Sequence, residues 1–148
     1  MIIPLRAHSA NGSLKRSVLN IDEYIKKAVD IGLTHLTLTD YSSMSASIEF
    51  YSKCIKAGIT PIIGIEIEII NTVNINLYGN KYRVVLLAKN YNGYRRLIKI
   101  HNKIKLSKNS YINMQDVYNI GGNDLIALFP CSINPVVMAE AYNDINTI

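Results

Sequence analysis

The sequence predicts an α/β fold built on parallel strands, and three observations favour it. Segments with strand character alternate with segments of helical character along most of the chain. The stretch from Lys27 to Ile69 reads as helix, strand, loop, helix and strand, which is the repeating unit of such folds. The predicted strand Arg83–Ala88 is nearly continuously apolar, as expected where helices cover both faces of a sheet.

The chain begins with a predicted strand at Ile2–Ala7 and a polar loop at Ala10–Ser17. Asn20 is placed to cap a first helix, with Glu23 in the capping-box position three residues later. Gly32 is placed to end that helix. The face that we expect to be buried consists of Ile21, Tyr24, Ile25, Ala28 and Val29.

The second predicted strand is Thr34–Thr39, and Asp40 follows it directly. Either Ser42 or Ser43 is placed to cap a second helix, which Gly58 ends. The i, i+3, i+4 spacing predicts a buried stripe on that helix of Met44, Ile48, Tyr51 and Ile55.

The third predicted strand follows Pro61 and has two different faces. One face carries Ile63, Ile65, Ile67 and Ile69, and the other carries Ile62, Gly64, Glu66 and Glu68. A lone glutamate among isoleucines needs a partner. Glu66 therefore has the strongest claim of these residues to a functional role.

The second half of the chain continues the pattern. Asn71–Asn80 is a predicted hairpin or loop, and Asn90 or Asn92 is placed to cap a basic helix whose inner side is Tyr94, Leu97, Ile98 and Ile104. The remaining predicted elements are a short helix at Gln115–Ile120, a turn at Gly121–Asp124, a strand at Leu125–Phe129 and a last helix at Pro135–Tyr142.

Length and composition exclude several classes of protein. A chain of 148 residues predicts one domain, and 49% hydrophobic residues exclude a disordered chain. The apolar runs are strand-length and no signal peptide is visible, so we expect no membrane segment. Two cysteines do not make a disulfide framework, which favours a cytoplasmic setting.

The net charge of +5 is unevenly distributed, because no acidic residue lies between Glu68 and Asp116. A stretch of one sign can attract nucleic acid, but the favoured interpretation is a solvated helix face followed by a basic loop. If DNA binds there, the candidate residues are Arg95, Arg96, Lys99 and Lys103.

Several stretches, in order along the chain, resemble one family. They are Pro4–Ser9, Gly32–Tyr41, the segment from Glu49 to Glu66, Tyr82–Asn90 with Gly93 and Tyr94, and Leu125–Leu128 up to Cys131. Together they resemble the PHP (polymerase and histidinol phosphatase) domain at the N-terminus of bacterial DNA polymerase III alpha subunits.

The resemblance implies part of a distorted, seven-stranded TIM-like barrel. On this basis residues 1–148 are expected to be one PHP domain, an N-terminal fragment without the last barrel strands. An incomplete barrel leaves a strand edge unpaired, so self-association is also expected. The whole protein would be a DNA-directed DNA polymerase, with this fragment itself inactive.

The family gathers metal ligands at positions that match seven residues here. His8, Asp40, Glu66 and Cys131 keep their ligand types, whereas Arg6, Tyr41 and Arg83 stand where the family has histidine. Arginine stays protonated and cannot ligate a cation. The resemblance therefore implies a degenerate site with no catalytic residues, and no cofactor beyond weakly bound zinc, manganese or magnesium is expected.

Each retained residue also has a structural interpretation. His8 could be a barrel histidine with satisfied hydrogen bonds, Asp40 a cap for the loop that follows its strand, and Cys131 an inert buried thiol. A carboxylate that has lost its metal needs another cation, so we expect Arg6 to pair with Asp40 or Glu66, with Arg83 as a second candidate.

The favoured function is therefore a structural or docking module of a replicative polymerase. The partners implied by the resemblance are the rest of the polymerase alpha chain and a proofreading exonuclease subunit. Two alternatives stay open: a metal-dependent phosphoesterase, and a nucleic-acid-binding module that uses the basic stretch 81–108.

Overall fold

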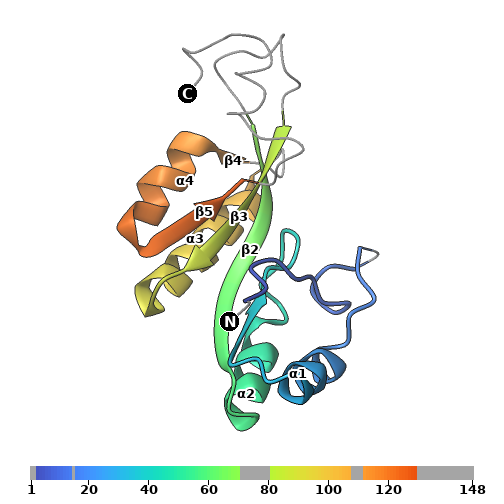
Figure 1. Ribbon diagram of the computed structural model, residues 1–148. Coiled ribbons are helices and arrows are strands. Elements are labelled where there is room, and N and C mark those ends of the chain that lie inside the picture. The colour runs from blue at the N-terminus through green and yellow to red at the C-terminus, as the bar shows by residue number, and fades with distance from the viewer. Residues whose placement is uncertain (1–2, 15, 71–80, 108–111, 130–148) are drawn as a thin grey trace, which may run out of the picture.

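The computed structural model describes residues 3–14, 16–70, 81–107 and 112–129 (Figure 1). The described strands are β1 (His35–Leu38), β2 (Thr60–Ile70), β3 (Lys81–Ala88), β4 (Ile112–Asn113) and β5 (Leu125–Leu128). The helices are α1 (Ile21–Asp30), α2 (Ser47–Lys56), α3 (Tyr91–Leu106), α4 (Met114–Gly121) and the 3-10 turn η1 (Gly122–Asp124). Within these ranges no helix is long and apolar enough to cross a bilayer. Cys131 and the predicted helix Pro135–Tyr142 lie outside the described residues.

The five strands form one mixed sheet, organised on the long strand β2. The first part of β2 pairs in parallel with β1, up to the Leu38–Ile63 register pair. From Gly64 onward β2 pairs antiparallel with β3, while β4 pairs in parallel with its far end. β5 pairs antiparallel with the other edge of β3.

The prediction of an all-parallel sheet is therefore wrong for β3 and β5. The reason is the short connection, because only residues 71–80 separate β2 from β3. A parallel crossover needs a dozen or more residues, whereas antiparallel neighbours need only a turn. A mixed α/β sheet with a parallel β1–β2 unit is present, and the seven-stranded barrel stays a prediction.

The predicted first strand, Ile2–Ala7, is also wrong over its described residues, which are not in a regular strand. Ala7 still lies beside the end of β1, where its carbonyl accepts from the Thr39 N–H at 2.7 Å. The Ala7 N–H donates to the side-chain oxygen of Thr39 at 3.0 Å, which takes the place of a backbone ladder bond. Pro4 has no N–H to extend the pairing.

The helix boundaries follow the predicted capping residues in most cases. The Asn20 side chain accepts from the N–H groups of Asp22 and Glu23 at the start of α1, and Asn90 accepts from Gly93 at the start of α3. Gly32 and Gly58 have φ of +73° and +72° just after α1 and α2, as expected of helix-ending glycines.

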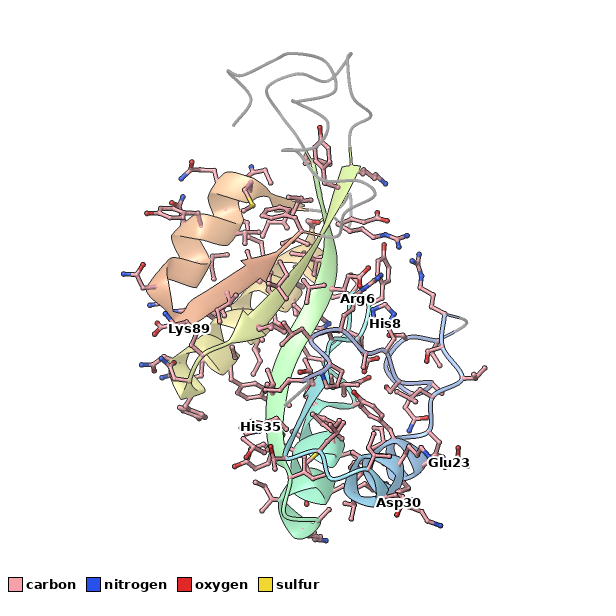
Figure 2. The ribbon with its side chains drawn as sticks, in the orientation of Figure 1. Arg6, His8, Glu23, Asp30, His35 and Lys89 are labelled. Atoms are coloured by element: carbon pink, nitrogen blue, oxygen red, sulfur yellow. The ribbon has the colours of Figure 1, made fainter. Side chains whose placement is uncertain are left out.

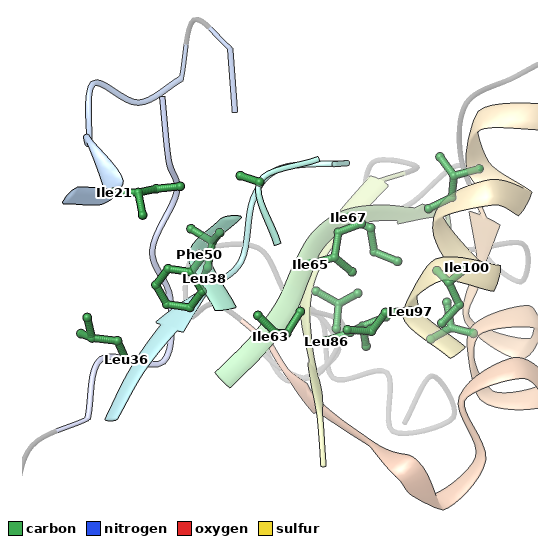
Figure 3. Close-up of a cluster of buried hydrophobic side chains, with 14 of the residues drawn as sticks. Ile21, Leu36, Leu38, Phe50, Ile63, Ile65, Ile67, Leu86, Leu97 and Ile100 are labelled. Carbon is green, nitrogen blue, oxygen red and sulfur yellow. The ribbon is translucent and has the colours of Figure 1, made fainter. Parts of the chain in front are cut away.

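The core lies on the isoleucine face of β2 (Figure 3). Towards the first half of the strand, Leu36 and Leu38 of β1 meet Phe50 of α2. Towards the second half, Ile65 and Ile67 share the core with Leu86 of β3 and with Leu97 and Ile100 of α3. The predicted burial of one β2 face is confirmed, since Ile65 and Ile67 have no exposed surface.

The predicted orientation of α2 is wrong. Of the predicted stripe, Ile48, Tyr51 and Ile55 are exposed, and the buried residues of α2 are Ser47, Phe50 and Cys54. Phe50 has the largest fully buried side chain and stacks on Tyr24 of α1 with ring centroids 6.5 Å apart. Burying this aromatic ring rotates the helix away from its aliphatic stripe.

Two smaller predictions at these helices are also wrong. Ala46 occupies the N-cap position of α2 and makes no side-chain capping bond there, so neither Ser42 nor Ser43 caps the helix. Val29 of α1 is half exposed, because α1 meets the rest of the core through Ile21, Ile25 and Ala28.

We predict that Ile48→Ala changes the free energy of unfolding by no more than about 0.5 kcal/mol, whereas Phe50→Ala costs about 3–5 kcal/mol. The physical reason is that Ile48 is 74% exposed and Phe50 is fully buried. Urea denaturation of both variants measures the difference. Equal losses would mean that the aliphatic stripe faces the core.

Candidate functional site

The buried carboxylate of Glu66 is the centre of the site. Arg6 donates two hydrogen bonds to it, from Nε to Oε2 at 2.6 Å and from an Nη atom to Oε1 at 3.0 Å. The Nε2 atom of His8 lies 2.9 Å from Oε2, and Nη1 of Arg83 lies 3.8 Å from Oε1. Figure 2 shows Arg6 and His8 together beside β2.

The strand pattern places Glu66 on the face opposite the α3 core. Ile65 and Ile67 point to that core, so the residue between them points away from it. Its backbone is held as well, because its N–H donates to the carbonyl of Asp40 at 3.1 Å and its carbonyl accepts from Ser42 at 2.7 Å. The loop after β1 thus lies directly against the site.

Burial and charge act in opposite directions on Glu66. Burial in the protein would raise the pKa of this carboxyl, but the hydrogen bonds and charges of Arg6 and His8 outweigh it and hold the pKa below its ordinary value. Glu66 has no exposed surface, whereas the Arg6 side chain is 48% exposed. The pair is therefore half buried, with the anion inside and the cation reaching solvent.

Asp40 is satisfied by a different set of donors. Its Oδ1 accepts from the Ser9 N–H at 2.6 Å and from the Ser13 hydroxyl at 2.7 Å, and its Oδ2 accepts from the Ser9 hydroxyl at 2.8 Å. Ser13 also accepts from the Tyr41 N–H at 2.8 Å. Of the two expected partners for Arg6, the arginine bonds to Glu66, and Asp40 holds the loop of residues 9–13.

Gly12 is part of the enclosure around Asp40. A Cβ atom at this position would lie 1.9 Å from Oδ2 of Asp40. The Gly12 N–H donates to the Ser9 hydroxyl at 2.9 Å, so the loop wraps closely over the carboxylate. Close approach of backbone to a side chain is a position that favours glycine.

Tyr41 forms the outer wall of the site. The guanidinium of Arg16 lies 3.6 Å from the centre of its ring, and that of Arg83 lies 5.6 Å away. Burial raises the pKa of Tyr41 to about 12, and the hydrogen bond and charge of Glu68 add to the shift. Tyr41 thus connects the arginines to a second glutamate.

The predicted nucleic-acid residues lie on α3, on the other side of the sheet. Arg96 is engaged, because it bonds to Asp124 at 2.7 Å and to the Ile120 carbonyl at 2.6 Å. Lys103 lies 2.9 Å from Asp116. Arg95 and Lys99 are exposed on this helix.

Ser9, Ser13, Gly12, Arg16 and Glu68 belong to the site but were not among its predicted members. Ser9 directly precedes the polar loop that the sequence predicts and Ser13 lies within it, yet nothing in their spacing indicates that they would enclose Asp40. The sequence places Glu68 on the polar face of the third predicted strand, two residues from Glu66, and that alternation is the one available signal.

The described residues do not fit a multinuclear metal cluster. Within them, no group of three or more His, Cys, Asp or Glu side chains is placed to hold an ion. Both oxygens of Glu66 accept from Arg6, and both oxygens of Asp40 accept from serine donors. His8 and Glu66 remain adjacent, with a guanidinium beside them.

Comparisons with known proteins agree with the motifs. The PHP domain family matches residues 4–146. The DNA polymerase III subunit alpha of Ureaplasma parvum is 43% identical over 108 residues, which is 73% of this chain and 10% of that protein. The same subunit of Bacillus subtilis is 38% identical over 98 residues, 66% of this chain and 8% of that protein. The chain thus spans about a tenth of these relatives.

Solved structures with a similar fold are more distant in sequence. An amidohydrolase from Chromobacterium violaceum superposes with a TM-score of 0.52 at 20% identity, covering 70% of this chain and 33% of that one. A protein named as a metal-dependent phosphoesterase, from Bifidobacterium adolescentis, superposes with a TM-score of 0.50 at 10% identity, covering 70% and 32%. The family match over nearly the whole length and the shared fold give one conclusion: this chain belongs to the PHP domain family.

Proposed function

We propose that this chain is the PHP module of a replicative DNA polymerase III alpha subunit and that its former metal site is a structural charge cluster. We use the name charge cluster for Arg6, His8, Glu66 and Arg83. The observation that carries the proposal is the two-bond contact between Arg6 and the fully buried Glu66.

The cluster connects segments that are distant in the chain. Arg6 and His8 belong to the N-terminal segment, Glu66 to the middle of β2 and Arg83 to β3. A buried carboxylate without a compensating charge costs several kcal/mol. Pairing therefore stabilises the folded arrangement of these segments.

The role of the whole protein is inferred from its relatives. In this proposal the parent chain copies DNA as a DNA-directed DNA polymerase in the cytoplasm, and the module supports the polymerase core and offers a docking face for a proofreading exonuclease subunit. The relatives named above support the first part through their identity to this chain.

Two other functions have weaker support. Metal-dependent phosphoester hydrolysis is favoured by the fold, but the occupied oxygens of Glu66 and Asp40 count against it. DNA binding through α3 is favoured by the exposed Arg95 and Lys99. It is disfavoured by the ion pairs of Arg96 with Asp124 and of Lys103 with Asp116, which neutralise part of the positive charge of the helix.

We predict that Arg6→Ala lowers the free energy of unfolding by about 1–3 kcal/mol, because it leaves Glu66 buried with weaker compensation. The expected loss is below that of a fully buried pair, since the Arg6 side chain is 48% exposed and partly screened by solvent. Urea denaturation measures the change, with Arg95→Ala on α3 as the matched control.

The double variant Arg6→Ala/Glu66→Gln separates pairing from simple packing. Removing the charge of Glu66 should recover part of the loss caused by Arg6→Ala. If Arg6→Ala is as stable as the Arg95→Ala control, or if the second change recovers nothing, then Arg6 does not stabilise the fold through Glu66.

We predict that part of the stability depends on pH through Glu66. The pKa of this group is depressed in the folded protein, so its contribution is fully present above the unfolded value of about 4.3 and is lost as pH falls through the lower folded value. The stability advantage of the parent over Glu66→Gln should therefore shrink as the pH is lowered from about 6 to about 3. An advantage that is constant over this range would contradict a charged Glu66.

We predict that the purified protein retains fewer than two zinc or manganese ions per chain after dialysis. The arginines repel divalent cations, and the carboxylate oxygens already accept hydrogen bonds from protein donors. Elemental analysis measures the metal content, and a variant with Arg6→His, Tyr41→His and Arg83→His serves as comparison. Two or more ions in the parent, with turnover of a generic phosphate ester, would instead support the phosphoesterase alternative.

A further inference from the structure

A groove lies between α2 and α3 on the isoleucine face of the sheet. Its floor is made by Pro61 and Ile63 of β2 and by Ala88 of β3, and its volume is about 510 Å³. The walls are the start of α2 and the first turn of α3. Ile63 points to the core face of β2 and Glu66 points to the other face, so the groove and the charge cluster lie on opposite sides of the sheet.

Both walls of the groove carry exposed apolar and aromatic side chains. Tyr91 of α3 is 73% exposed, and its ring centre lies 6.4 Å from that of Tyr94. On α2, Ile48 and Tyr51 are exposed, and Ile55 continues the same stripe one turn further. A concentration of exposed apolar side chains of this kind marks an interaction site. Tyrosine is enriched at such sites because its ring packs against a partner while its hydroxyl forms hydrogen bonds.

The polar groups that line the groove are engaged with the protein itself. Lys89 donates to the Asn123 carbonyl at 2.9 Å, and Figure 2 shows Lys89 away from the labelled residues of the charge cluster. Asn90 accepts from the Gly93 N–H at 2.9 Å and donates to Asp124 at 3.0 Å. A small-molecule site needs a few convergent polar groups to orient its ligand. This groove therefore favours the apolar side chains of a protein partner over a small polar ligand.

The unpaired charge beside the groove is positive. Arg95 lies one turn after Tyr91 on the same face of α3, and together with Lys99 it lines a second hollow of about 250 Å³. Among the described residues, no carboxylate lies within salt-bridge distance of Arg95 or Lys99. Arg96, which lines the same hollow, is neutralised by Asp124 at 2.7 Å. The two remaining cations favour an acidic partner.

The charged residues of α2 lie on its other side, away from the groove. Lys53 lies 2.7 Å from Glu49 of the same helix and 2.7 Å from Asp22 of α1, so this side of α2 faces α1. The side toward α3 keeps the apolar Ile48 and Tyr51. The groove thus combines an apolar surface with positive charge along α3. This pattern is complementary to a helix with one apolar face and an acidic flank.

We propose that the groove between α2 and α3 binds an acidic amphipathic helix of a partner protein. A helix suits a groove bounded by two helices, because its residues at i, i+3, i+4 and i+7 form one apolar stripe. Its carboxylates meet Arg95 and Lys99. A second copy of this chain is a poorer match, because a net charge of +5 makes two copies repel each other. The inference uses no residue of the charge cluster and does not depend on the polymerase assignment.

The test selects binders of the full chain by phage display from a library of random peptides of about 16 residues, roughly four helical turns. The enriched peptides should share apolar residues at helical spacing together with Asp or Glu. The most enriched peptide is then synthesised with a fluorescent label, and its binding is measured by fluorescence anisotropy. A dissociation constant on the order of 10 μM is expected. The circular dichroism of the mixture should show helix gained on binding.

Matched variants assign the binding to the groove. Tyr51→Ala and Tyr91→Ala should each weaken peptide binding about tenfold, because buried tyrosines are frequent hot spots of interfaces. Tyr118→Ala on α4 is the control, since Tyr118 is 70% exposed and lies outside the groove. Arg95→Gln should weaken binding and reduce its dependence on salt, whereas Lys26→Gln on the exposed side of α1 should leave both unchanged.

Several results would overturn the proposal. They are the absence of enriched acidic amphipathic peptides, and an equal loss of binding in Tyr91→Ala and Tyr118→Ala. A dimer in analytical ultracentrifugation that Tyr51→Glu abolishes would show that a second copy fills the groove instead. An oligonucleotide whose binding is weakened by Arg95→Gln and not by Tyr91→Ala, with no peptide bound, would indicate a nucleic-acid surface.

The outcome is separable from that of the structural role. Tyr51 and Tyr91 are exposed, so the urea midpoints of their alanine variants should match that of the parent. Peptide binding can therefore fail while Arg6→Ala still destabilises the fold. Conversely, the groove can bind its peptide in a protein whose stability does not depend on Arg6.

Discussion

The structure depends on one buried carboxylate, that of Glu66 in the middle of the central strand. A charge with no exposed surface needs compensation, and here two bonds from Arg6 and a contact from His8 supply it. Because those residues belong to the N-terminal segment, the charge draws a non-regular part of the chain onto the sheet. Arg83 adds a cation from the neighbouring strand, so one group connects three segments.

The long strand β2 makes this arrangement possible by changing partners along its length. It pairs in parallel with β1 as far as Ile63 and antiparallel with β3 from Gly64 onward. A Cβ atom at Gly64 would lie 2.6 Å from the Leu86 carbonyl oxygen, so the change of partner occurs at a residue without a side chain. Glu66 follows two residues later, where the loop after β1 and strand β3 both lie close by.

The two carboxylates that the resemblance predicts as metal ligands, Asp40 and Glu66, are satisfied in different ways here. Glu66 accepts from a guanidinium, which restores the positive charge that a metal would supply. Asp40 accepts from two hydroxyls and a backbone N–H, which supply hydrogen bonds without a charge. The first arrangement leaves arginines partly exposed at the surface.

The sequence by itself determined the family, several helix ends and the buried face of the central strand. Asn20, Asn90, Gly32 and Gly58 act locally, so their roles at helix ends could be predicted from neighbouring residues. The alternation along β2 likewise predicted a buried isoleucine face and a glutamate that needs a partner.

Only the tertiary structure decided the rest. The helical spacing of apolar residues does not determine which side of α2 is buried, because Phe50 lies on a different side from the aliphatic stripe. In the folded protein the Phe50 side is buried. Strand direction depended on the short connection between β2 and β3. The choice of Glu66 over Asp40 as the partner of Arg6 depended on Ser9 and Ser13, because hydrogen bonds between residues about thirty positions apart leave no periodic signal in the sequence.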